Sequence, residues 1–228
     1  MRRFNYANKK KAIPTAKDKA KAMVSKEPLN EVQKKQIKRM VKAPLELKYH
    51  SKNWNGQTFG TSGNYALFDL CDIPQNTTDN GRIGDRVELS SFEYTFTIYP
   101  YTVTAAHTIR IIFFQYKPNL ASTLPTLDQI LDNGPTAMLD SWSPYDFDFR
   151  TDYTILSDKM YQMNPGSTTA VVTKGRTVLR TSRAKKDITF TAGSVFGANH
   201  IYCVFMTQSP ISTPPAVYGR SRIFFKDG

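Results

Sequence analysis

Cysteine is scarce in this sequence. Cys71 and Cys203 are its only cysteines in 228 residues, and each lies in an apolar, β-like run, ALFDLCDI and IYCVFM. A small secreted scaffold held together by disulfides would use more of them. We therefore expect two buried free thiols, with a single disulfide as the alternative.

Long apolar runs are also missing. The longest are far shorter than the roughly 18 residues that a membrane-spanning helix needs. The first residues, MRRFNYANKKK, contain no apolar segment of the kind found in signal peptides. We expect no membrane span, and a chain that is made in the cytosol and stays soluble.

Residues suited to catalysis are few. His50, His107 and His200 are the only histidines, and none has a cysteine or histidine neighbour at the spacing of metal ligands. The sequence contains no G-x-S-x-G, no phosphate-binding loop and no H-E-x-x-H. We therefore predict that the protein is not an enzyme and uses no cofactor.

Four aspartates within 13 residues are the one carboxylate cluster: Asp140, Asp146, Asp148 and Asp152. Carboxylates this close can bind calcium when glutamate or carbonyl oxygens join them. Their spacing is not that of an EF-hand. We interpret them as exposed loop acids or as partners of a neighbouring copy's arginine, and keep a calcium site as the alternative.

Acidic residues are rare at the N-terminus, where basic residues accumulate. Residues 1–42 contain 14 Lys or Arg and three acids, a net charge of +11, whereas the other 186 residues hold 17 bases and 16 acids. Such asymmetry is typical of a tail that binds a polyanion, either nucleic acid or an anionic membrane. Its dispersed lysines also resemble a nuclear-import signal. The candidate nucleic-acid-binding residues here are Arg2, Arg3, Lys9, Lys10, Lys11, Lys17, Lys19, Lys21, Lys34, Lys35, Lys38, Arg39 and Lys42.

The basic segment, residues 1–43, has two parts. Met1 to Glu27 has few large apolar groups, and we expect it to be disordered in solution. Residues 30–42 are predicted to form an amphipathic helix, with Asn30 as N-cap, Gln33 three residues on, and Pro44 just beyond its end. Such a helix can be a solvated element docked on the body, or can bind membranes or calmodulin. We favour docking by its apolar stripe, with its lysines turned to nucleic acid.

The rest of the chain, residues 44–228, alternates like a β protein. Arg82 to Pro100 is the clearest strand. Phe92, Tyr94, Phe96 and Ile98 are predicted to face the core, and the Ser, Glu and Thr residues between them to face outward. His107 to Lys117 is apolar on both faces, which predicts a central position in a sheet.

Counting from Tyr65, the sequence predicts eight antiparallel strands. Glu46 to His50 alternates only weakly, and Asn53 to Asn64 is rich in turn residues. The expected fold is all-β, a sandwich of two four-stranded sheets, and a single jelly roll has this size and strand count. The predicted strands are Tyr65–Ile73, Arg82–Pro100, His107–Lys117, Arg150–Met163, Ser167–Ser182 with a break at Lys174-Gly175, Asp187–Thr191, His200–Thr207 and Tyr218–Phe225.

A long connection separates two of these strands. Pro118 to Phe149 includes a predicted helical turn, Thr126 to Leu131, and the aromatic and acidic piece SWSPYDFDF. A loop of this length in a compact domain is usually functional or a packing surface. Its aromatic residues, Trp142, Tyr145, Phe147 and Phe149, are costly to expose together. We predict a subunit interface, with core burial second and stacking on nucleotide bases third.

A second basic cluster follows on and after the strand that begins at Ser167. It comprises Arg176, Arg180, Arg183, Lys185 and Lys186. These residues can contact nucleic acid on the inside of a shell, or can pair with the acids of a neighbouring copy. The residue pattern favours neither.

Four features follow one another along most of the chain: the basic tail and Lys-rich helix running into Glu46-Leu47-Lys48; Arg82-x-Gly84-Asp85-x-Val87 before an aromatic strand; Ile109-Arg110-Ile111-Ile112-Phe113 with Lys117-Pro118-Asn119 and the Thr126–Leu131 turn; and Arg150 ahead of Ile155-Leu156-x-Asp158-Lys159. In this order they resemble the capsid proteins of small circular Rep-encoding single-stranded DNA viruses (CRESS-DNA viruses), the circovirus-like group. The tail departs from many relatives in being rich in lysine rather than arginine.

The resemblance implies a function in the virion. Roughly sixty copies of one jelly roll would close into the smallest icosahedral shell, since closed symmetry prevents open-ended growth. The partners it implies are further copies of the chain, single-stranded nucleic acid, DNA rather than RNA, and the nuclear-import machinery of a host whose nucleus is the assembly site. The alternatives are a jelly-roll capsid of a small RNA or satellite virus, and a cellular β-sandwich binding module with a basic anchor.

Overall fold

The computed structural model describes residues 30–34, 47–58, 65–99, 107–133, 139–163, 171–178, 186–207 and 215–227. The chain divides into two units, Met1–Pro44 and Leu45–Gly228. In the first unit, residues 31–34 are helical. Among the described residues, no helix has the length and apolar character needed to cross a membrane.

Asn30 and Gln33 cap the start of this helix reciprocally. The Gln33 N–H donates to Asn30 Oδ1 at 2.8 Å, and the Asn30 N–H donates to Gln33 Oε1 at 3.1 Å. These two bonds are a capping box, and they confirm the predicted helix start. The predicted continuation through residues 35–42 lies outside the described residues, as do all the basic candidates of this unit except Lys34.

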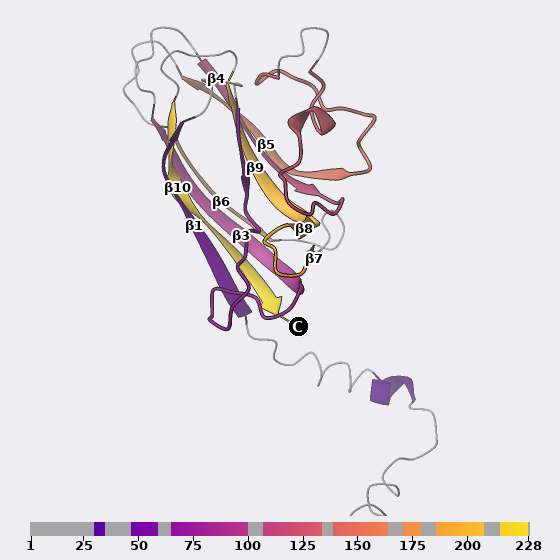
Figure 1. Cartoon of the computed structure of the whole chain (residues 1–228). Helices are drawn as coiled ribbons and strands as arrows, with labels where there is room; N and C mark the ends of the chain where they lie inside the picture. Colours follow the sequence, from indigo (N-terminus) through magenta and orange to yellow (C-terminus); the bar gives the residue numbers. More distant parts are fainter. Residues whose placement is uncertain are drawn as a thin grey trace, which may run out of the picture. The chain divides into compact units, whose positions relative to one another are not determined.

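The described part of the second unit forms ten strands and one 3₁₀ turn (Figure 1). The predicted helical turn at Thr126 to Leu131 is thereby confirmed. The elements are β1 (Leu47–Thr58), β2 (Tyr65–Asp69), β3 (Arg86–Tyr99), β4 (His107–Tyr116), η1 (Leu127–Gln129), β5 (Tyr153–Met163), β6 (Val171–Val178), β7 (Asp187–Phe190), β8 (Gly197–Ala198), β9 (His200–Thr207) and β10 (Ala216–Asp227).

The strands form two antiparallel sheets. Sheet A has the order β1-β10-β3-β7-β8, with β6 also paired to β3, and sheet B has the order β2-β9-β4-β5. Among the eight longer strands, the first pairs with the last, the second with the seventh, the third with the sixth, and the fourth with the fifth. One long hairpin rolled up in this way is a jelly roll, which confirms the predicted fold class.

The main core lies between the two sheets. Phe92, Tyr94, Phe96 and Ile98 of β3 are at most 5% exposed, which confirms the predicted alternation. They pack with residues from β4, β9 and β10 in one cluster. Phe113 of β4 contacts the rings of Phe92, Tyr94 and Phe96 at centroid distances of 5.4, 4.5 and 6.2 Å.

A second core covers the outer face of sheet B. Strand β4 lies between β9 and β5, and its described side chains are buried on both faces, as predicted. Ile112, Phe114 and Tyr116 pack there with Leu127 and Leu131 from the connection after β4. In Figure 1 this connection lies on the side of sheet B away from sheet A. The body therefore has three layers.

Three details of the strand prediction are wrong. Residues 53–58, the first half of the predicted turn-rich stretch, belong to β1, which continues to Thr58 past a register shift between Trp54 and Gln57; residues 59–64 lie outside the described residues. Sheet A has six strands, not four, because β1 and the short β8 join it in addition to the four predicted strands β3, β6, β7 and β10. Strand β6 is not broken at Lys174-Gly175, since both residues stay in register with Thr95 and Tyr94 of β3.

Candidate functional site

Most of the connection between β4 and β5 is attached to sheet B, and its residues 118–152 are called here the insertion. Tyr116 donates its hydroxyl to Gln129 Oε1 at 2.8 Å, and Tyr153 donates to the Asp146 carbonyl at 2.6 Å. An isolated antiparallel bridge joins Leu131 to Tyr145 within it. These bonds hold the described part of the insertion flat against the second core.

Arg110 of β4 is the polar anchor of the insertion. Its Nη2 lies 2.7 Å from Asp158 Oδ2, its Nε donates to the same carboxylate, and its Nη1 donates to the Ser143 carbonyl. The Tyr145 hydroxyl donates to Asp158 Oδ2 at 2.5 Å, and the Arg110 guanidinium lies over the Tyr145 ring. Burial alone would raise the pKa of Asp158, but the hydrogen bonds from Arg110 and Tyr145 outweigh it and lower that pKa.

The four aromatic candidates of the insertion divide into two groups. Tyr145 is half-buried in the anchor, so the structure places it within the subunit. Trp142, Phe147 and Phe149 are 55, 75 and 39% exposed, which excludes core burial of these three in the single chain. An interface between subunits and stacking on bases are the two earlier interpretations that fit this exposure.

The insertion is also acidic. Residues 118–152 contain six aspartates and one arginine, a net charge of −5. Asp140 Oδ1 accepts from the Trp142 N–H, Asp146 Oδ1 accepts from the Asp148 N–H, and Asp152 Oδ1 accepts from Thr151. Within the described ranges no three His, Cys, Asp or Glu side chains are placed to hold a metal ion, so the calcium candidates are not brought together.

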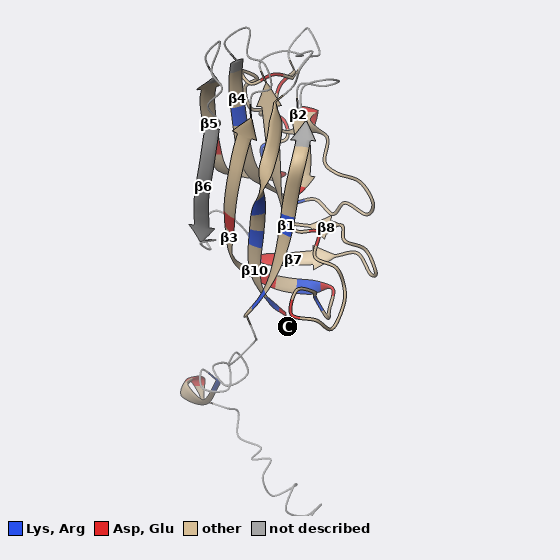
Figure 2. Ribbon diagram, turned by 90° about the vertical axis from the view of Figure 1, so that its left-hand side faces the viewer, with Lys and Arg blue, Asp and Glu red and all other residues tan. Residues whose placement is uncertain are grey.

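The outer face of sheet A has a different character. Tyr49 of β1, Tyr99 of β3, and Tyr218 and Arg220 of β10 are all exposed there. Arg222 lies over the Tyr49 ring at 4.9 Å, and the rings of Tyr99 and Tyr218 meet edge-to-face at 5.3 Å. Figure 2 looks onto this side of the sheet, with the basic residues of β10 next to β3. Sequence reasoning missed this surface because residues 46–50 alternate only weakly, the residues from Asn53 were predicted to form a turn, and the β10 arginines were not linked to any cluster.

The second basic cluster is only partly described. The backbone register pairs Arg176 of β6 with Glu93 of β3, and Lys174 with Thr95. Glu93 and Thr95 are in turn paired with Arg222 and Arg220 of β10. Lys186 is half-buried just before β7. Arg180, Arg183 and Lys185 lie outside the described residues.

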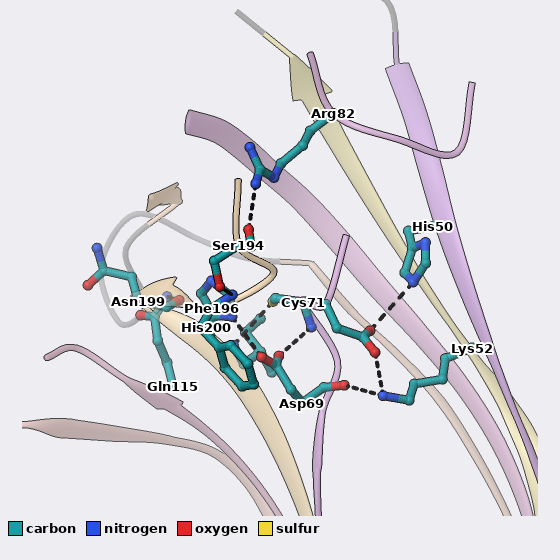
Figure 3. Close-up of polar contacts among 12 residues, drawn as sticks. His50, Lys52, Asp69, Cys71, Arg82, Gln115, Ser194, Phe196, Asn199 and His200 are labelled. Atoms are coloured by element: carbon teal, nitrogen blue, oxygen red, sulfur yellow. Dashed lines mark hydrogen bonds and ion pairs between the residues drawn. The ribbon is translucent and has the colours of Figure 1, made fainter. Parts of the chain in front are cut away.

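Two polar networks near the start of β9 hold the body together (Figure 3). His200 Nδ1 lies 2.8 Å from Asp69 Oδ2, with both side chains almost fully buried. Asp69 Oδ1 also accepts from the Cys71 N–H at 2.7 Å. Both cysteines are buried and free, as predicted, and burial raises the pKa of each thiol well above its ordinary value. A protonated, buried thiol is a poor nucleophile.

The Asp72 carboxylate pairs with two inward-facing residues of β1. Lys52 Nζ is 2.6 Å from Asp72 Oδ2, and His50 Nε2 is 3.5 Å from Asp72 Oδ1. Burial would raise the pKa of Asp72, but the bonds from His50 and Lys52 lower it. Polar residues thus occupy inward-facing positions of β1. For this reason its sequence shows only a weak alternation of apolar and polar residues.

Gly84 and Asp85 of the Arg82-x-Gly84-Asp85 motif accept hydrogen bonds from the Arg82 side chain. Its side chain is fully buried and donates to the Gly84 carbonyl, to Asp85 Oδ1 and to the Ser194 carbonyl. The guanidinium also lies 4.1 Å from the centre of the Phe190 ring. The motif therefore ties the loop before β3 to the loop after β7.

Comparison with known proteins gives structural matches alone. No protein-family model matches the sequence, and neither does any curated protein. Three solved structures that resemble the chain come from viruses. Desmodium yellow mottle tymovirus matches with a TM-score of 0.40 and 9% identity, covering 81% of this chain and 89% of that one. Cocksfoot mottle virus matches with a TM-score of 0.28 and 13% identity, covering 80% and 93%. The VP1 pentamer of Human Polyomavirus 6 matches with a TM-score of 0.29 and 11% identity, covering 88% and 96%.

Proposed function

We propose that this protein is the capsid protein of a CRESS-DNA virus, which assembles into a small shell and packages single-stranded DNA. The observation that carries the proposal is the combination of a jelly-roll body with a basic segment that holds nearly all of the excess charge. The jelly roll is common in viral capsids, although it also occurs in lectins and cupins. The order of motifs along the chain resembles that of the circovirus-like capsid proteins, and it favours a viral capsid over a lectin or a cupin.

The charge of the N-terminal segment supports a role in packaging. Residues 1–42 have a net charge of +11, in contrast to +1 for the remainder. Lysine side chains neutralise phosphates as point charges but offer little geometry for reading bases. Binding through them would be independent of sequence and strongly dependent on salt. Such binding suits a protein that must coat a whole genome.

The exposed aromatics of the insertion support self-assembly. Trp142 and Phe147 are more than half exposed on a loop that Arg110 anchors firmly to sheet B. Large aromatic side chains held on a rigid support are typical anchors of protein interfaces. Contacts of this kind, repeated around a closed shell of roughly sixty copies, would join the subunits.

The proposal is tested on purified full-length protein. Negative-stain microscopy and light scattering should show uniform closed particles, and the nucleic acid extracted from them should be digested by DNase. Nucleic acid that only RNase digests would instead indicate a capsid of a small RNA or satellite virus. A protein that stays monomeric over the accessible range of concentration and salt would overturn the capsid proposal in favour of a binding module.

A further inference from the structure

We propose that the outer face of sheet A is a base-stacking platform for single-stranded nucleic acid, formed by Tyr49, Tyr99 and Tyr218 with Arg220 and Arg222. The inference rests on the proposed function, because it assigns the packaged strand to one face of the body. It implies that the opposite side, which presents the acidic insertion, faces away from the nucleic acid.

The tyrosines are exposed although they lie on paired strands. Tyr49, Tyr99 and Tyr218 are 44, 47 and 39% exposed. The insertion buries much of the outer face of sheet B, whereas these rings of sheet A remain accessible. Proteins that bind single strands without sequence preference present such rings beside positive charge, since every base has a face that can stack.

The rings are also held in place. Gly56 of β1 has a φ of +67°, and a Cβ built on it would lie 2.9 Å from the Tyr218 hydroxyl. Tyr218 therefore lies close over the irregular part of β1, with Tyr99 edge-to-face on its other side. Tyr49 is covered in part by the Arg222 guanidinium, whose Nε donates to Ser51 at 3.2 Å. Ordering the rings in advance reduces the entropy lost on binding.

The charges of this face suit a phosphate backbone. Arg220 is exposed at the centre of the sheet, opposite Thr95 on β3. The register places Lys174 of β6 on the far side of the same Thr95, and Arg176 on the far side of Glu93. Neighbouring strands lie about 4.8 Å apart. The backbone register thus places four basic residues in two rows across the strands, with Thr95 in the middle of one row and Glu93 in the middle of the other. The insertion, by contrast, has a net charge of −5.

The first test separates stacking from charge in the full-length protein. Binding of an oligo(dT) strand is titrated with salt for the wild type, Tyr218→Thr and Arg220→Gln. Tyr218→Thr should weaken binding roughly five- to 150-fold at every salt concentration without changing the slope. Arg220→Gln should reduce the log–log salt slope by about 0.7, the value for one phosphate contact with a single strand.

Matched controls come from the other side of the body. Tyr65 on β2 of sheet B has the same 39% exposure as Tyr218, and Arg150 is an exposed arginine of the insertion. Tyr65→Thr and Arg150→Gln should leave both the affinity and the slope unchanged. Thermal unfolding of each variant shows whether it remains folded.

A second test maps the contact without any variant. Ultraviolet crosslinking of oligo(dT) to the wild-type protein, followed by peptide mass spectrometry, should mark peptides that contain Tyr218, Tyr99 or Tyr49. Crosslinks confined to residues 1–44 and the insertion would overturn the platform but leave packaging by the N-terminal segment standing. Absence of any binding by the full-length protein would instead overturn the proposed function itself.

Discussion

Arg110 and Asp158 form a two-point ion pair across β4 and β5, with Arg110 Nη2 2.7 Å and Nε 3.0 Å from the Asp158 carboxylate. The Arg110 side chain is 6% exposed, so removal of the carboxylate leaves a buried charge without its counterion. We expect Asp158→Asn to lower the free energy of unfolding by roughly 3 kcal/mol. Urea denaturation measures this change, and proteolysis should cleave the insertion faster.

An exposed ion pair provides the control for this prediction. Arg86 and Asp187 lie 2.9 Å apart, but their side chains are 66 and 54% exposed. Asp187→Asn should change the free energy of unfolding by no more than about 1 kcal/mol. Equal losses from the two substitutions would mean that Arg110 does not anchor the insertion. The pair Arg110→Met with Asp158→Asn should recover part of the loss, since no buried charge is then left.

The lowered pKa of Asp158 makes this anchor sensitive to acid. A carboxylate whose pKa is lower in the folded than in the unfolded state contributes stability above the unfolded value, which is about 3.9 for aspartate. That contribution is lost as the pH falls through the folded value. The stability difference between the wild type and Asp158→Asn should therefore be full near neutral pH and shrink below about pH 4. A difference that does not vary with pH, in urea titrations from neutral to acid, would contradict this prediction.

The alternation of β3 was predictable from sequence because its successive residues face the core and the solvent in turn, and their side chains are apolar and polar in the same order. Phe96 is fully buried and contacts the rings of Trp54 and Phe205, whereas its neighbour Thr95 is exposed. Phe96→Ala should lower the free energy of unfolding by about 3–5 kcal/mol, and Thr95→Ala should be mild by comparison. Similar losses from both, measured by chemical denaturation, would mean that the register of β3 is wrong.

Strand β1 and the outer face of sheet A were not predictable in the same way. Lys52 of β1 faces inward and is stabilised by Asp72, which lies 20 residues along the chain, so no local pattern marks it as a strand residue. Likewise, Tyr49 and Arg222 meet across two strands 173 positions apart in sequence. Contacts between residues this far apart in sequence depend on the order in which the strands pair. The local pattern of apolar and polar residues carries no information on that order. The exposed aromatics of the insertion were found because they are adjacent in sequence.

The two tryptophans allow assembly to be separated from folding. Trp142 is 55% exposed on the insertion, and Trp54 is 2% exposed in the core. Trp142→Ala should leave the melting temperature nearly unchanged but abolish particles, since interface anchors contribute about 2 kcal/mol or more per contact. Trp54→Ala should cost about 3–5 kcal/mol of folding stability. If Trp142→Ala forms normal particles, or melts as low as Trp54→Ala, Trp142 is not an interface anchor.

The N-terminal segment should be dispensable for the fold and necessary for packaging. A chain that starts at Ala43 keeps every strand that the structure describes, because β1 begins at Leu47, and it loses all 14 basic residues of the segment. If about half of them engage phosphates, the log–log salt slope on a single strand should fall by about 5. We expect circular dichroism and the melting temperature to change little, while filter binding to single-stranded DNA weakens by orders of magnitude. Residual binding should keep a shallow slope and depend on Arg220 and Tyr218. An unchanged affinity and slope after truncation would mean that the body alone packages the strand.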